Sequence, residues 1–174
     1  MSTTEITIGI ICNIAASLIF LFIVLVALKP KIAISNVICK NTGYQIQIVN
    51  KSVFMSYDIN AKLWICTKDA ESQGGEIDKT FDSITLVVDS IFRIPPRPWL
   101  FGKEKTYVAS RFRTHQDLNK ILTEGNQSII IMVSAKHGLS GLTEFFSKEY
   151  SDVKQIKDGK FASGDKINDV VSLL

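Results

Sequence analysis

The chain has 174 residues, of which 46% are hydrophobic and 21% charged, and its formal net charge at pH 7 is +3. This mild basic excess argues against a protein that binds duplex nucleic acid through a strongly basic surface. The three cysteines form no C-x-x-C pair and have no histidine nearby in sequence, which argues against a disulfide framework or a cysteine metal site. A chain of this length is expected to form one domain of ordinary size.

The first element is an uncharged apolar run from Ile6 to Leu28. At about 1.5 Å rise per residue, a helix over this run is roughly 35 Å long, enough to cross a hydrocarbon core of about 30 Å. We therefore predict an extracytoplasmic tail over 1–5, a transmembrane helix over 6–28 and a cytosolic domain over 29–174. A cleaved signal peptide is the alternative, but it would need a basic start and a shorter apolar core.

The charges on either side of this run predict its orientation. Glu5 is the only charged residue before the run, whereas Lys29, Lys31 and Lys40 follow it closely. Basic residues near the end of a span favour the cytoplasmic side of the membrane. We therefore predict a single-pass protein of the inner membrane, with its N-terminus outside and its C-terminal domain in the cytoplasm.

Small and polar residues form a stripe along one side of the predicted span, made of Gly9, Cys12, Asn13 and Ala16. Small residues let two helices approach closely, and an amide in hydrocarbon gains about 1 kcal/mol from a partner across a helix interface. We therefore expect a homo-oligomer that forms through this stripe. The alternative is that Asn13 reaches the lipid headgroups from its end of the helix.

Alternating patterns begin after Pro30, which ends the helix because it lacks a backbone donor. The ranges 31–39 and 44–49 predict two strands, and the turn residues Asn41 to Gly43 between them predict a hairpin. Further strands are predicted over 57–67, 84–89, 91–94, 107–113, 129–135 and 144–150.

One helix and a polar tail complete the predicted domain. The helix is expected over 115–122 with Thr114 as its N-cap, and the tail over 152–174 is typical of a loop with a single strand near 160–162. Many short strands without a repeated strand–helix–strand pattern predict an all-β fold, an immunoglobulin-like antiparallel β-sandwich. A small barrel is the alternative.

The chain resembles small uncharacterised bacterial membrane proteins that have one N-terminal span and a β-sandwich-like cytosolic domain. The resemblance lies in short motifs, which are Lys29-Pro30-Lys31-Ile32, Ile48-Val49-Asn50-Lys51-Ser52, Tyr57-Asp58-Ile59, Arg111-Phe112-Arg113-Thr114, Asp117-Leu118 and Leu139-Ser140-Gly141. It implies an anchor and a fold, with no established activity. Some bacterial proteins of this layout are membrane effectors in antiviral systems, a role that follows here by analogy of fold.

Cationic and aromatic residues gather in one window of the domain. The candidate ligand-binding residues are Arg93, Arg97, Trp99, Lys103, Lys105, Arg111 and Arg113. Guanidinium groups bind phosphate oxygens in pairs, and an aromatic face can stack on a base or lie at a lipid interface. We predict an anionic ligand, either nucleotide-like or an anionic lipid headgroup. The alternative is that Arg111 and Arg113 cover the solvent-facing side of a strand.

The sequence has no catalytic signature. His115 and His137 are its two histidines, and the spacing of His137 and Ser140 is typical of a turn in which the hydroxyl bonds the backbone. There is no glycine-rich phosphate loop, nucleophile elbow or metal-ligand spacing. We therefore expect no catalysis, cofactor or metal. The predicted function is a membrane-anchored binding or effector module, and the alternative is a passive adaptor that tethers a cytosolic protein complex.

Overall fold

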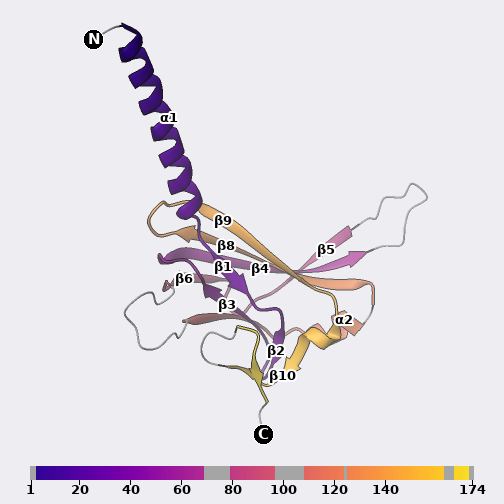
Figure 1. The fold of residues 1–174 in the computed structure, drawn as a ribbon. Helices are drawn as coiled ribbons and strands as arrows, with labels where there is room; N and C mark the ends of the chain where they lie inside the picture. Colours follow the sequence, from indigo (N-terminus) through magenta and orange to yellow (C-terminus); the bar gives the residue numbers. More distant parts are fainter. Residues whose placement is uncertain (1–2, 69–78, 97–107, 124, 163–166, 173–174) are drawn as a thin grey trace, which may run out of the picture.

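The computed structural model describes residues 3–68, 79–96, 108–123, 125–162 and 167–172. One apolar helix leads into a mainly β domain in which two sheets pack against each other (Figure 1). The predicted order of an N-terminal helix and a sandwich-like β domain is confirmed. The immunoglobulin-like topology stays a prediction.

Helix α1 (Thr3–Ala27) projects away from the domain (Figure 1). Its stretch Thr3–Phe22 is long and apolar enough to cross a membrane, and none of it is buried against the rest of the chain. By length and composition alone, such a helix fits a membrane anchor or a signal sequence. The last backbone bond of the helical ladder joins the Leu28 N–H to the Val24 carbonyl at 2.9 Å, two residues before Pro30.

The first sheet is built around β3 (Tyr44–Asn50). Strand β7 (Ala109–Thr114) pairs antiparallel along one side of β3, and the short strands β1 (Ile32–Ile34) and β2 (Ile38–Lys40) follow one another along its other side. Strand β10 (Ile156–Asp158) then pairs parallel with β2. The predicted hairpin between β2 and β3 is confirmed.

The second sheet is built around the long strand β4 (Ser56–Lys68). Strand β8 (Gln127–His137) pairs antiparallel with one side of β4, and β9 (Thr143–Tyr150) lies beyond β8. Two short strands, β5 (Lys79–Ile84) and β6 (Ser90–Ile94), follow one another along the other side of β4. Each sheet therefore has a long central strand with two short strands in series at one edge.

Two predicted strands are wrong. The strand expected over 31–39 breaks between β1 and β2, because the buried Ser35 hydroxyl donates to the Val37 carbonyl at 2.8 Å and turns the chain inward. The strand expected over 84–89 ends where β5 ends, at Ile84. Residues 85–89 instead form the loop between β5 and β6 of the second sheet, and the Val87 N–H of this loop donates to the Arg113 carbonyl of β7 in the first sheet at 2.8 Å.

The short helix of the domain is confirmed, but its cap was predicted wrongly. Helix α2 spans Leu118–Thr123, and the Asp117 carboxylate accepts the backbone N–H groups of Asn119 at 3.1 Å and Lys120 at 3.4 Å. The Thr114 hydroxyl donates instead to the Thr85 carbonyl at 2.8 Å. Thr114 therefore fastens the β5–β6 loop of the second sheet to β7 of the first sheet.

The C-terminal tail is more ordered than a loop. It contains a short 3-10 helix η1 (Val153–Gln155), then β10, and then a hairpin of β11 (Lys160–Phe161) and β12 (Val170–Val171). Phe161 is buried with Val37 and Cys39 in a small cluster of its own. The strand predicted near 160–162 is confirmed, and the hairpin covers the outer face of the first sheet.

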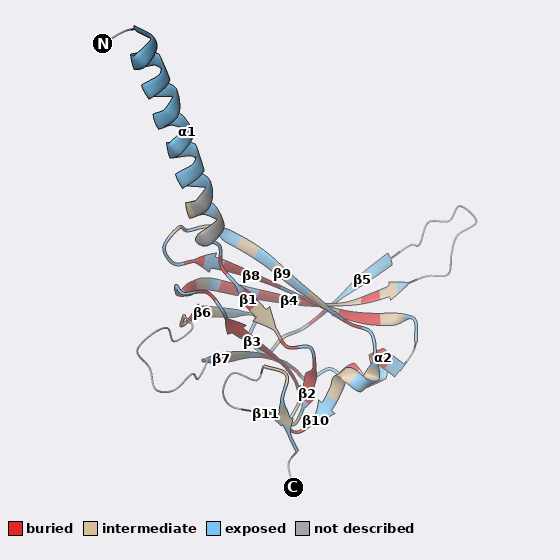
Figure 2. Ribbon diagram, in the orientation of Figure 1, coloured by how far each residue is buried: buried red, intermediate tan, exposed pale blue. Residues whose placement is uncertain are grey.

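The main core lies between the two sheets (Figure 2). Alternate residues of the central strands, such as Ile46 and Ile48 in β3 and Ile59 and Leu63 in β4, are at most 2% exposed. Full burial of each such side chain contributes about 1.5–3 kcal/mol. The Tyr150 hydroxyl crosses this core and donates to the Ser35 carbonyl at 2.6 Å, which ties β9 to the break between β1 and β2. Burial raises the pKa of Tyr150 above its ordinary value.

Candidate functional site

The structure places the described arginines of the predicted ligand site on different sheets. Arg93 lies on β6 opposite Tyr57, whereas Arg111 and Arg113 lie on β7 opposite Gln47 and Gln45. All three arginines are exposed. The other predicted members, Arg97, Trp99, Lys103 and Lys105, lie outside the described residues. The proposed joint role of all these residues in binding an anion stays a prediction.

Arg111 is held by contacts within the domain. Its Nε donates to Gln47 Oε1 at 3.1 Å, and its Nη2 lies 3.5 Å from the Phe161 carbonyl oxygen. The guanidinium carbon also lies 5.8 Å from the centre of the Phe161 ring, which is a cation–π distance. Arg111 therefore helps to hold the β11–β12 hairpin on the first sheet.

Arg113 has a different surrounding. Together with Arg111, it lines a cavity of about 220 Å³ whose other wall is formed by Val87 and Val88 of the β5–β6 loop. The two valines are about half exposed. A guanidinium beside an open apolar wall can accept an anion that also carries an apolar group. Among the three described arginines, Arg113 is thus placed best for a ligand.

The predicted oligomer stripe is fully exposed along α1. Gly9, Cys12, Asn13 and Ala16 all lie on the helix outside the domain, and a β-carbon added at Gly9 would meet nothing within 4 Å. The Ser17 hydroxyl donates to the Asn13 carbonyl at 2.8 Å, so this serine is satisfied within its own helix. The stripe is free to meet a second helix, and its role as an interface stays a prediction.

A junction fixes the end of α1 to the domain, and the sequence did not reveal it. The Ser140 hydroxyl donates to the Leu28 carbonyl at 2.8 Å, and Lys29 Nζ lies 3.8 Å from a carboxylate oxygen of Glu144. The last carbonyls of a helix have no partner within the helix, so a side chain from elsewhere can satisfy one of them. The helix end is therefore bonded to the turn between β8 and β9, beside which it lies in Figure 1.

A second turn braces this junction. The Lys51 N–H donates to the Lys31 carbonyl at 2.7 Å, so the turn between β3 and β4 lies beside the chain that leaves the helix. The Gly138 N–H donates to the Met55 carbonyl at 2.8 Å and joins the two turns directly. A β-carbon at Gly138 would lie 2.7 Å from that Met55 oxygen, so only glycine permits this approach.

His137 lies at the centre of the junction and is only 1% exposed. Its Nδ1 lies 3.3 Å from the Ser140 N–H nitrogen and 3.1 Å from Ser140 Oγ, and its ring meets the Phe54 ring edge to face at 5.3 Å. Its Nε2 is buried without a hydrogen-bond partner in the described structure. Burial lowers the pKa of His137 below its ordinary value, because the charged imidazolium would lose water.

We expect the domain to lose stability in acid through His137. The pKa of His137 is lower in the folded chain than in the unfolded chain. Its contribution to the free energy of unfolding is therefore complete above the unfolded pKa of about 6.5 and decreases as the pH falls below that value. His137→Gln should flatten this pH dependence below about pH 6.5. The measurement is urea unfolding of the detergent-solubilised chain by tryptophan fluorescence, with exposed His115→Gln as the control. If the free energy of unfolding of His137→Gln depends on pH as steeply as that of the unchanged chain, the loss of stability in acid does not come from His137.

An open cavity of about 450 Å³ lies beside the junction. It is lined by Tyr57, Asp58, Phe92, Lys136 and the turn residues 137–141. Asp58 and Lys136 lie 4.0 Å apart as an exposed ion pair, so they leave little net charge for an anion. Asp58 has a φ of 48° at the point where the pairing of β4 with β8 shifts register. The bulge therefore opens the sheet at this cavity.

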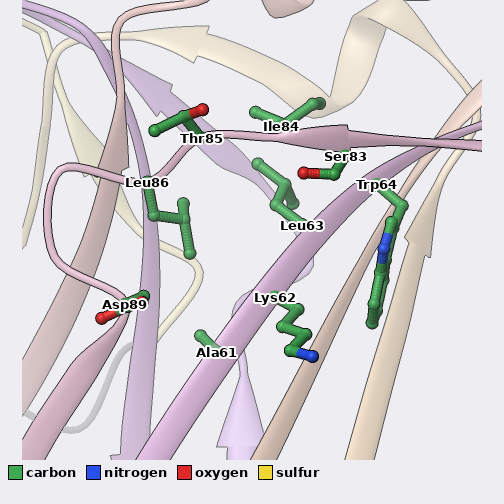
Figure 3. A pocket seen from close by; sticks show the side chains of 9 residues that line it. All are labelled: Ala61, Lys62, Leu63, Trp64, Ser83, Ile84, Thr85, Leu86 and Asp89. Carbon is green, nitrogen blue, oxygen red and sulfur yellow. The ribbon is translucent and has the colours of Figure 1, made fainter.

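A further cavity of about 340 Å³ lies where the edge partner of β4 changes from β5 to β6 (Figure 3). Its lining comes from β4, the end of β5 and the connection 85–89. Leu63 and Leu86 give it apolar walls, and Ser83, Thr85 and Asp89 supply polar groups. The space exists because the two short edge strands leave a gap along β4.

The described residues assemble no recognisable chemical site. No three His, Cys, Asp or Glu side chains among them could hold a metal ion together. The Ser140 hydroxyl is engaged with the Leu28 carbonyl, so its contact with His137 serves the junction in this arrangement. The feature that links the most elements is the junction itself.

Sequence reasoning identified the turn at His137 to Gly141 but not its partner. Ser140 and Leu28 are 112 positions apart, and no periodic pattern connects them. The signal that could have pointed to the junction was the pair of glycines, Gly138 and Gly141, which flank exposed Leu139. A glycine beside a buried histidine suggests a close backbone approach.

Comparison with known proteins places the chain in no family. The evidence for function is therefore the geometry of the chain itself, above all the contact between helix and domain. Neither a protein-family model nor a curated protein matches the sequence.

Proposed function

We propose that this chain is a single-pass membrane effector in which α1 is a permanent anchor and the β domain, a sandwich of immunoglobulin-like type, senses a ligand or protein partner in the cytoplasm. The helix oligomerises through its small-residue stripe. The role is of the kind found in bacterial antiviral systems. The length and apolar character of α1 and the basic residues Lys29, Lys31 and Lys40 behind it support this proposal.

One observation carries the proposal, the bond from the Ser140 hydroxyl to the Leu28 carbonyl at 2.8 Å. With the Lys29 to Glu144 ion pair, it fixes the helix end to the β8–β9 turn. A change in the domain that moves this turn would therefore act on the helix end. A signal sequence is cut away and has no use for such a contact, whereas an effector needs a stiff connection between sensor and membrane.

The ligand of this module is proposed to be anionic. Arg113 lies exposed beside the cavity of about 220 Å³, and its backbone carbonyl on the first sheet accepts the N–H of Val87 in the β5–β6 loop of the second sheet. A ligand at Arg113 would therefore act on the segment that bridges both sheets. Arg113→Gln with Arg111 intact is the variant that separates ligand binding from the structural role of Arg111.

A passive adaptor is the second candidate, and one surface favours it. The outer face of the second sheet exposes Phe145 (68%) and Met132 (37%) around a largely apolar cavity of about 170 Å³ that Trp64 also lines. Exposed apolar patches of this kind often mark protein contacts. An adaptor would bind its partner there without acting on the membrane.

We expect the chain to stay uncut in the membrane fraction of bacterial cells after a carbonate wash. Protease added to spheroplasts should leave the C-terminal domain intact, because that domain faces the cytoplasm. The measurements are immunoblots against tags at either end. A shortened product outside the membrane would show that α1 is a signal sequence. Cleavage of the domain by external protease would show that the domain lies outside the cytoplasm, opposite to the proposed orientation.

We expect induced expression of the effector to depolarise the membrane or arrest growth, and we expect Ser140→Ala with Glu144→Gln to reduce that effect. The double change removes both side-chain bonds between helix and domain while leaving the apolar span intact. The readouts are a potential-sensitive dye and growth rate at matched protein levels. Ser147→Ala, at an exposed position on β9, is the control. Wild-type expression that neither depolarises the membrane nor slows growth at these protein levels would favour the adaptor.

A further inference from the structure

The end of the domain that receives α1 carries exposed apolar side chains as well as the junction. Leu139, at the tip of the β8–β9 turn, is 62% exposed, and Val53 and Phe54 in the β3–β4 turn are 49% and 39% exposed. Phe54 also contacts the His137 ring, so the two turns form one surface. We call Val53, Phe54 and Leu139 the juxtamembrane tips.

The contacts of the junction set the depth of Leu139. Its neighbour Ser140 bonds the carbonyl of Leu28, which is the last residue of the apolar run. The side chain of Leu139 therefore lies within a few ångströms, about one side-chain length, of the level at which the helix leaves the hydrocarbon. If the span ends at Leu28, this level is the headgroup layer, which adds about 5–8 Å on each side of the core.

The charges of this surface fit a bilayer better than a protein groove. Lys29, Lys31, Lys51 and Lys136 are all exposed around the tips. The nearby acids Glu144 and Asp58 are each within 4.0 Å of one of these lysines. Lysines beside a span are attracted to anionic headgroups, each by about 1 kcal/mol near the surface.

We propose that the juxtamembrane tips form a lipid-contact surface, with Leu139 inserted among the headgroups and the surrounding lysines on anionic lipid. The occupant is the bilayer surface into which α1 continues. This inference rests on the proposed anchoring by α1 and adds a second contact with the same membrane. The domain is then held against the bilayer at a fixed tilt, and any movement of the tips acts on lipid directly.

The test places an environment-sensitive NBD label at Leu139→Cys in the full chain, reconstituted in vesicles of phosphatidylcholine and phosphatidylglycerol. Exposed Cys12 is changed to Ser, whereas Cys39 and Cys66 are buried and stay. The matched control is Thr42→Cys, an exposed position in the β2–β3 turn at the opposite end of β3. A second label at Val53→Cys reports on the neighbouring tip if the first variant does not fold.

The label at 139 should be quenched by spin-labelled lipid and shielded from aqueous iodide, by at least about threefold relative to the label at 42. The label at 53 should show the same preference. Flotation of the vesicles after a carbonate wash is measured on the same samples. A chain that does not float refutes the anchor and the lipid contact together. A chain that floats while both tip labels are as open to iodide as the label at 42 overturns the lipid contact alone.

Discussion

Replacing Phe112 with alanine is expected to lower the free energy of unfolding by about 3–5 kcal/mol. Phe112 lies on β7 opposite Ile46 of β3, and it is 1% exposed at the centre of the main core. The change removes an aromatic ring from between the two sheets and leaves a cavity that the strands cannot close. Because single domains are stable by about 5–15 kcal/mol, the loss would be a large part of the total.

The control for this experiment is Phe145→Ala, because Phe145 is 68% exposed on the outer face of β9. Surface changes of this kind usually alter stability by no more than about 0.5 kcal/mol. Both variants are unfolded with urea in the same detergent and followed by tryptophan fluorescence. If Phe112→Ala and Phe145→Ala lowered the free energy of unfolding by the same amount, the two sheets would not pack through Phe112.

The sandwich was predictable where the local pattern and the burial agree. In β4 and β8 a period of two runs through many residues, and the side chains of the core face, such as Ile59 and Ile131, are fully buried. Such a pattern specifies both the strand and the face that it buries. The apolar run of α1 is equally direct, because no residue from Ile6 to Ala27 is charged.

The errors lie where a distant residue decides the local structure. The break at Ser35 depends on the Tyr150 hydroxyl, 115 positions away, and on the N–H of Gln47, which lies 3.2 Å from the Ser35 hydroxyl. The three-residue strand β10 is too short to show a period and exists because β2 offers it an edge. The strand predicted over 84–89 does not form, because the Val87 N–H bonds to the Arg113 carbonyl of β7.

The candidate site shows the same limit. The arginine window was visible as composition, yet the sheets separate Arg93 from Arg111 and Arg113. The junction was invisible because its residues, Leu28 and Ser140, are ordinary types that become informative only when the fold brings them together. Charge and hydropathy therefore predicted the membrane helix, while its coupling to the domain required the tertiary structure.

Gly159→Ala is expected to release the β11–β12 hairpin and expose Cys39. Gly159 has a φ of 140°, and an added β-carbon would lie 2.2 Å from the Val171 carbonyl oxygen, so the hairpin must move. A strained backbone of this kind costs about 1–3 kcal/mol, which raises the population of the open form by about 5- to 150-fold. The Cys39 thiol, which donates to the Gly159 carbonyl at 2.8 Å, would then meet solvent.

The measurement is the rate at which a thiol reagent modifies Cys39 in the native chain, followed by mass spectrometry of its peptides. Burial raises the pKa of Cys39 in spite of the opposing influence of Arg111, so the native thiol should react slowly. The control is Gly125→Ala, which changes another glycine of positive φ (75°) but one with nothing within 4 Å of the new β-carbon. Gly125→Ala should leave the Cys39 rate unchanged, because that turn is remote from the hairpin. Equal Cys39 rates in Gly159→Ala and the unmodified chain would mean that the hairpin does not seal the outer face of the first sheet.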